Sequence, residues 1–418
     1  MRSNPCQTLA EHSCARWFML ATIFLSTAYS NVLQNLLARE HVLNVTAGDS
    51  AAIDSPVVFE VPTDLRGEDQ LQLSGQAQTP IAVQWFRRGE GLAAFVLPAK
   101  LATGQTLRFQ LRPHNSPLGE DARASKSGDG NYLSLFLRSK EVLRYPLVIQ
   151  QPPNGIEQLF AHSGHIHPLF TPTGRIVTAE FPADHAHQHA IFNAWVNTTF
   201  EGRKLDFWNQ RAQTAKVEHL RYHGSTSGQV FAEFTVEMLH SDLIAPGGPK
   251  PVLKDLWTVR TWNVSSGFLM DIESRQTCIA QSPLTVEEYH YGGMSFRGRE
   301  EWLGETASRF LTSDGKTRAN GNHTRPHWVA IEGLIDGSPC SVAIMGHPNN
   351  FRHPEPVRLH PNKPYFVFTP PQLGKFDLRP GEEFVARYRY FVNDALAEST
   401  SINAVWNAYR APPKTRVE

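Results

Sequence analysis

Histidines gather in one short part of this sequence. Six of the 18 lie between residues 162 and 189, and three of these follow Asp184 at alternate positions. Imidazole titrates near neutral pH, so it takes and gives protons, and its neutral form also binds transition metals. Alternate residues of a β-strand point to one face, so we expect His185, His187 and His189 to share a face. The pattern predicts a functional site.

A second pair of histidines, His165 and His167, precedes this run, and a turn-forming Thr-Pro-Thr-Gly stretch separates the two groups. We expect both groups to face one pocket, where His185 or His187 acts as a general acid and His165, His167 and His189 hold substrate. The alternative is a hydrogen-bonded ladder of histidines at the rim of a sheet, without chemistry.

Acids and arginines surround a glycine pair at residues 287–302. Glu287 or Glu288 is a candidate base opposite a histidine, and Arg297 can form a forked contact with a carboxylate or with neighbouring hydroxyls. A surface loop whose charges pair with one another is the alternative for this segment.

Two further histidines flank an asparagine pair at residues 347–353, where His347, Asn350 and His353 are candidate substrate-binding residues. Ordinary turn chemistry is the alternative there. Aromatic side chains can stack on sugar rings or form the core, and both interpretations apply to four tryptophans: Trp195, Trp208, Trp302 and Trp328.

A metal site is a second interpretation of the histidine run. His185, His187 and His189 provide three neutral ligands for a divalent ion and leave a coordination position open. Of the four cysteines, Cys6 and Cys14 lie in an expected signal peptide, so a cysteine-ligated zinc or iron–sulfur site is excluded for the mature chain. Cys278 and Cys340 either pair or remain buried thiols.

Short apolar and polar alternations dominate the chain from residue 55 to residue 393, with Gly, Pro and Asp between them. They predict an all-β protein, in which a small β-sandwich module at 50–113 precedes a large antiparallel β-sandwich at 131–393. Residues 394–418 are expected to form a C-terminal helix and tail, because apolar residues at 402–409 recur on one helical face.

The 418 residues contain 40 basic and 40 acidic side chains, so no strong positive field is present to bind nucleic acid. Residues 1–30 resemble a secretory signal peptide, because arginines precede a short apolar run that ends in small residues. We therefore expect an exported, periplasmic or extracellular protein. No later stretch has the length to span a membrane, so membrane insertion is not expected after signal removal.

Several motifs resemble the bacterial family labelled PmoA, or methane oxygenase. They are the runs H-P-L-F-T-P-T-G-R from His167, D-H-A-H-Q-H-A-I-F-N-A-W from Asp184, L-D-F-W from Leu205 and M-G-H-P-N-N-F-R-H-P from Met345, together with the 289–302 segment. The resemblance covers about residues 131–393. It implies an exported β-protein from polysaccharide-degrading bacteria. The large sandwich is also similar to the supersandwich of galactose mutarotase-like proteins.

Three functions are consistent with these features. The first is an enzyme of hydrolase, lyase or epimerase type that acts on a carbohydrate or related polyol. The second is a histidine-ligated metal enzyme, either an oxygenase or a hydrolase. The third is a protein that binds glycan without chemistry. In each case the partner is a small molecule or a glycan.

Overall fold

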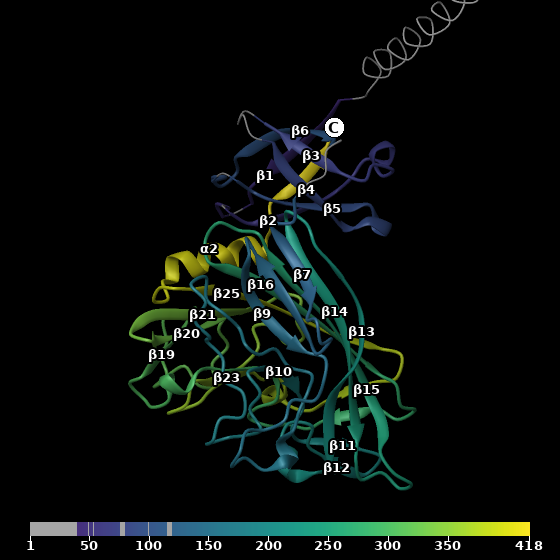
Figure 1. The fold of residues 1–418 in the computed structure, drawn as a ribbon, viewed down its shortest axis with the longest axis vertical. Coiled ribbons are helices and arrows are strands. Elements are labelled where there is room, and N and C mark those ends of the chain that lie inside the picture. The colour runs from purple at the N-terminus through teal and green to yellow at the C-terminus, as the bar shows by residue number, and fades with distance from the viewer. Residues whose placement is uncertain (1–39, 49, 53, 76–79, 99, 115–118) are drawn as a thin grey trace, which may run out of the picture.

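Strands make up almost all of the regular structure in the computed structural model, which describes residues 40–418 without 49, 53, 76–79, 99 and 115–118. One α-helix is present among these residues. The prediction of an all-β protein is therefore confirmed. The expected signal peptide lies outside the described residues. The chain forms a small upper unit and a larger lower unit (Figure 1).

The small unit is a seven-stranded sheet whose core includes Phe59, Phe95 and Phe109. Its first strand begins at His41, before the expected start at residue 50, and its last strand comes from the expected C-terminal tail. The order is β2 (Pro56–Glu60), β5 (Leu92–Val96), β4 (Ile81–Arg87), β3 (Leu71–Ser74), β6 (Thr106–Pro113), β1 (His41–Thr46) and β26 (Lys414–Val417).

The large unit is built on an eight-stranded antiparallel sheet. In its strand β16, Met270 and Ile272 enter the main core while Asp271 and Glu273 occupy the opposite face, because successive side chains alternate. The order is β13 (Ala215–Thr226), β14 (Phe231–Asp242), β15 (Lys250–Trp262), β16 (Phe268–Cys278), β25 (Glu383–Asn393), β21 (Ser338–Gly346), β20 (Trp328–Ile335) and β19 (Ser308–Thr312).

Three smaller sheets contribute side chains to the same core. One begins at Ala122, before the expected start of the large sandwich at residue 131. The first sheet is β10 (Ile191–Ala194), β18 (Gly293–Arg297), β23 (Tyr365–Phe368) and β22 (Val357–Leu359). The second is β12 (Arg203–Leu205), β11 (Thr198–Phe200), β17 (Leu284–Val286) and β24 (Phe376–Leu378). The third is β7 (Ala122–Lys126), β8 (Tyr132–Leu137) and β9 (Lys140–Pro146).

The other face of the large sheet is covered by the small unit and by α2 (Ser399–Arg410), the helix expected in this region. Ile402 and Trp406 of α2 are buried against this face. The Gln84 side chain of β4 accepts hydrogen bonds from the backbone N–H groups of Val230 and Phe231, at 3.0 and 3.1 Å. The two units are therefore joined by polar and apolar contacts.

The structure also shows the state of the two cysteines, the burial of four tryptophans and the lengths of the helices. Cys278 and Cys340 are buried free thiols. The four tryptophans that the sequence offered as sugar platforms are at most 2% exposed, so they belong to the core. No helix within the described part of the chain is long and apolar enough to cross a membrane.

Candidate functional site

The histidine run after Asp184 is not a strand. Residues 182–190 form consecutive turns, and the residues at its two ends, Phe181 and Ala190, have positive φ angles of 48° and 55°. The expectation that His185, His187 and His189 share one strand face is therefore wrong. A turning backbone directs their rings to different places, and the structure divides them between two environments.

The first environment is a buried histidine cluster formed by His162, His165 and His189. The rings of His162 and His189 stack with centroids 4.1 Å apart, and His165 lies 5.4 Å from His162. Burial lowers the pKa of His189 to about 3, so its ring is neutral at physiological pH. His165 and His189, both expected to hold substrate, are 0% and 1% exposed and lie inside the protein.

Polar groups surround this cluster. His165 Nε2 lies 2.5 Å from Glu180 Oε1, and His189 Nε2 lies 2.8 Å from Gln210 Oε1. Burial alone would raise the pKa of Glu180, but the contact with His165 lowers it below its usual value. The nearby His167 places Nδ1 3.0 Å from the Thr178 hydroxyl, and burial lowers its pKa to about 4.

The second environment is organised by Arg297, which is fully buried. Its guanidinium donates to Asp184 over 2.7 and 3.3 Å and to Gln188 Oε1 over 2.6 Å. Lys363 Nζ lies 2.5 Å from the same carboxylate. Burial opposes ionisation of Asp184, yet these two cations hold its pKa well below the usual range. The ion pairs at Asp184 and the hydrogen bond to Gln188 fix both ends of the 184–188 turn.

This anchor places His185 and His187 at the surface, with ring centroids 5.3 Å apart. His360 lies 6.2 Å from His185. Burial lowers the pKa of all three rings, to about 4 for His187 and His360, and the positive Lys363 adds to the effect at His185. Three neutral imidazoles therefore lie together, and a neutral imidazole accepts protons.

Ring contacts continue from His360 inward as a row that we call the aromatic wall, in which Tyr365 and Trp208 are buried, at 4% and 2% exposed. Tyr365 lies 6.3 Å from His360 and 6.1 Å from Trp208, and Tyr291 lies 5.6 Å from Trp208. Strand pairing explains the first part, because Tyr365 of β23 is paired with Arg297 of β18. The wall consists of His185, His187, His360, Tyr365, Trp208 and Tyr291.

A glycine pair brings Tyr291 to this wall. Gly292 and Gly293 both have φ of +127°, and a Cβ at Gly293 would lie 2.5 Å from the Phe368 carbonyl oxygen. Only glycine accepts this conformation and this close approach without strain. The chain therefore turns sharply before β18, with Tyr291 packed on Trp208.

A carboxyl group and a cation lie beside the wall. Asp206 accepts hydrogen bonds from the N–H groups of Trp208 and Asn209 through Oδ1, at 2.9 and 2.8 Å. Burial raises its pKa despite these bonds, which favours the protonated form. Arg358 contributes a positive charge that acts on Tyr291 and His360.

The two glutamates expected as bases lie at the end of β17, next to the loop that carries Tyr291. Glu287 Oε1 accepts a hydrogen bond from Thr199 at 2.6 Å and lies 3.3 Å from Lys204 Nζ. The bond from Thr199 lowers the pKa of Glu287, which keeps it ionised. Glu288 is exposed. The catalytic role of both residues stays a prediction.

The third predicted group lies near α2, where His347 contacts Tyr409 at 5.0 Å and His353 stacks on Trp406 at 5.7 Å. Asn350 donates to the buried Glu355 at 3.0 Å. Burial raises the pKa of Glu355 to about 7. These contacts place His347, Asn350 and His353 around the end of β21 and the helix, away from the residues that form the aromatic wall.

A metal site needs several donor side chains around one point. Within the described ranges, no three His, Cys, Asp or Glu side chains are arranged to hold a metal ion. His189 is bonded to Gln210 in the buried cluster, so it does not join His185 and His187 as a third ligand.

Comparison with known proteins identifies the family. The model of DUF6807, a family of unknown function, matches residues 133–407. The chain belongs to DUF6807. This match covers the large sandwich and most of α2, whereas the small unit lies outside it. The PmoA label of the resembling motifs does not appear in this match. No curated protein matches the chain.

Solved structures similar to this DUF6807 protein have low identity. A glycosyl hydrolase family 38 protein from Enterococcus faecalis is 10% identical, with a TM-score of 0.39. The alignment covers 91% of this chain and 47% of that protein. A galactose mutarotase related enzyme from Lactobacillus acidophilus is 10% identical with a TM-score of 0.32, covering 66% of this chain and 99% of that one. The heparan sulfate lyase HepC from Pedobacter heparinus, in a mutant form, is 11% identical with a TM-score of 0.32; 69% of this chain covers 38% of it. The chain thus spans about half of the first structure.

Several residues of this candidate site had no role in the sequence interpretation. They are Glu180, Asp206, Tyr291, Arg358, His360 and Lys363. Asp206 and Tyr291 lie inside motifs that carried the family resemblance, which was the available signal. No local sequence pattern marks Lys363 or His360. They come just before β23, and the pairing of β23 with β18 brings them to the Asp184 turn.

Proposed function

We propose that this protein is an exported enzyme of hydrolase, lyase or epimerase type that acts on a carbohydrate or related polyol at the aromatic wall. The observation that carries the proposal is the pair His185 and His187, two neutral imidazoles that the buried Arg297–Asp184 ion pair holds at the surface beside aromatic rings. Neutral imidazoles remove protons, and the partly exposed ring of Tyr291 can stack on the apolar face of a sugar.

The pKa directions distinguish the roles. A low pKa makes His185 a proton acceptor at neutral pH, in place of the acid role that the sequence suggested. Burial raises the pKa of Asp206, so we assign this carboxyl group beside the wall as the proton donor to an oxygen atom of the substrate. His187 and Arg358 are assigned to binding hydroxyl groups. Export rests on the signal-like residues 1–30, and the carbohydrate class is supported by the resemblance to the PmoA-labelled family.

The test is product analysis on a panel of plant and bacterial oligosaccharides, by mass spectrometry and by NMR of anomeric protons. We expect turnover of at least one glycan by the wild type and a loss of about 100-fold or more in His185→Ala and His187→Ala. His223→Ala is a matched control, since His223 is similarly half-exposed but pairs with Glu237 on β13 and β14.

Two outcomes would contradict this function. The first is unchanged turnover in His187→Ala. The second is glycan affinity without any product, which would show a binding protein rather than an enzyme.

A further inference from the structure

A polar cavity of about 490 Å³ lies where the small unit, the large sheet and helix α2 meet. Phe86 and Arg87 of β4 line it from the small unit, and Tyr409 lines it from α2. His347 and Asn349 contribute from the loop after β21. Its size lies within the range of about 300–1,000 Å³ that is usual for small-molecule sites.

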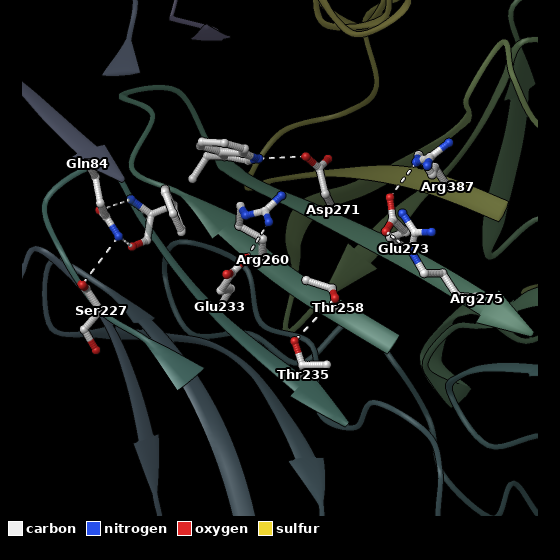
Figure 2. A network of polar contacts seen from close by, with 12 residues as sticks. Gln84, Ser227, Glu233, Thr235, Thr258, Arg260, Asp271, Glu273, Arg275 and Arg387 are labelled. Carbon is white, nitrogen blue, oxygen red and sulfur yellow. Dashed lines mark hydrogen bonds and ion pairs between the residues drawn. The ribbon is translucent and has the colours of Figure 1, made fainter. Parts of the chain in front are cut away.

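Cross-strand pairs of polar residues form the floor of the cavity. Glu233 of β14 is paired with Arg260 of β15, and Thr235 is paired with Thr258 one step further along the same face. Figure 2 shows the Glu233–Arg260 ion pair and the contact between the two threonine hydroxyls, which are 3.4 Å apart. Polar side chains on the outer face of an exposed sheet are hydrated by bulk solvent. Here the small unit and α2 cover this part of the sheet, so its polar side chains line a cavity.

Charges within the cavity are balanced. The lining has three arginines and three acids, and each acid already contacts an arginine. Glu273 accepts from Arg387 at 2.6 Å (Figure 2). Asp271 accepts at 2.7 Å from Arg389, which is buried and does not line the cavity. An anion or a cation would therefore gain little electrostatic binding energy in this cavity, because the charges that line it are already paired. The arrangement suits a neutral ligand with many hydroxyl groups, which can both donate and accept.

Some of the polar groups remain available. Arg260 Nε is buried and has no hydrogen-bond partner among the described residues, and a buried donor without a partner is costly. The two threonine hydroxyls make only a long contact with each other. The Phe86 ring lies under the Arg260 guanidinium at 4.2 Å and stacks with Trp262, so it forms part of the wall of the cavity and is not an open platform. Donors and acceptors on neighbouring strands are the features that recognise the hydroxyl groups of sugars.

We infer that this cavity is a second ligand site, which binds a neutral polyhydroxylated molecule of one or two sugar rings. It shares no residue with the aromatic wall. Sugar binding in this cavity can therefore be measured whether or not the aromatic wall is catalytic. A negative result for the cavity leaves the proposed enzyme activity untouched, and the reverse also holds.

The experiment is isothermal titration of the full chain with glucose, galactose, cellobiose and lactose, with glucuronate as the charged comparison. We expect at least one neutral sugar to bind and glucuronate to bind at least 5-fold more weakly than glucose. Thr258→Phe fills the cavity and is expected to weaken binding at least 10-fold. Thr258→Val removes only the hydroxyl and is expected to weaken it about 3-fold.

Two controls test whether the sugar binds in this cavity rather than elsewhere on the protein. His187→Ala alters the aromatic wall and is expected to leave this affinity unchanged. Thr106→Phe adds the same bulk at an exposed position of β6, and circular dichroism verifies that all variants are folded. Absence of binding by every neutral sugar overturns the inference. So does binding that Thr258→Phe leaves intact or that His187→Ala removes.

Discussion

Arg297 and Asp184 are 113 residues apart in the sequence and form a forked ion pair, with Nη2–Oδ1 at 2.7 Å and Nη1–Oδ2 at 3.3 Å. The guanidinium is fully buried, whereas 23% of the Asp184 side chain remains exposed. The pair therefore joins the core strand β18 to a surface turn. It is the contact that most directly fixes the positions of His185 and His187.

Asp184→Asn tests the energetic role of this pair. The substitution leaves a buried guanidinium with Gln188 but without its countercharge, so we expect the free energy of unfolding to fall by about 3–5 kcal/mol. Urea denaturation followed by tryptophan fluorescence measures it. Glu301→Gln is the control, because its partner Arg299 is one-third exposed, and its cost should stay below about 1 kcal/mol. Equal effects of the two substitutions would contradict the assigned role.

Buried histidines predict how stability depends on pH. His189 and His240 have folded-state pKa values of about 3, whereas an unfolded histidine titrates near 6.5. Below pH 6.5 the unfolded chain binds protons that the folded chain excludes, so stability falls as pH decreases toward 3. Each group should account for about 2 kcal/mol between pH 6.5 and pH 5.

His240→Leu isolates one of these groups, since neither ring nitrogen of His240 has a hydrogen-bond partner within the described residues. Urea titrations at pH 7 and pH 5 should show a smaller loss of stability in the variant than in the wild type, by about 2 kcal/mol. His223→Gln, at a half-exposed position, should keep the wild-type loss. An unchanged loss in His240→Leu would exclude this histidine as the source.

Asp206→Asn tests the proposed proton donor with little structural cost. The amide oxygen can still accept from the N–H groups of Trp208 and Asn209, but the side chain no longer supplies a proton. We expect kcat to fall by about 100-fold or more, with an unchanged melting temperature. Asp377→Asn, at an exposed carboxylate bonded to Thr285, is the control. Full activity in Asp206→Asn would exclude Asp206 as the proton donor.

Gln84→Ala tests how the small unit is attached. Besides accepting two hydrogen bonds, Gln84 donates through Nε2 to the Phe231 carbonyl at 3.0 Å. Nε2 also donates to the Ser227 carbonyl at 3.4 Å, so the substitution removes the Gln84 partner of four backbone groups, for which we expect about 1–3 kcal/mol of lost stability. Limited proteolysis should then cleave faster between the units. Gln72→Ala on β3 is the matched control and should digest at the wild-type rate.

The sequence was a good guide to the fold because a period of two is a direct consequence of strand geometry. In β16, for example, the apolar Met270 and Ile272 alternate with the acidic Asp271 and Glu273, and the structure buries the apolar pair on one face. It gave no information about partners distant in the sequence. The pairing of β26 with β1 therefore went unpredicted, and so did the covering of the outer sheet face by the small unit.

For the site, residue types were more informative than spacing. The histidines around residue 185 and Arg297 do converge, but alternate spacing was a poor argument because the backbone turns at Phe181 and Ala190. Positive φ at such residues is not visible in a hydrophobic pattern. The position of His189 inside the buried cluster follows from this turning.

Strand β26 at residues 414–417 completes the sheet of a unit whose other strands lie before residue 114. During synthesis on the ribosome, the small unit emerges some 300 residues before its last strand. Its sheet stays incomplete until the large sandwich has also been made, and β1 has an unpaired edge during that time. The small unit therefore cannot complete its sheet before the segment that follows the large sandwich has been made.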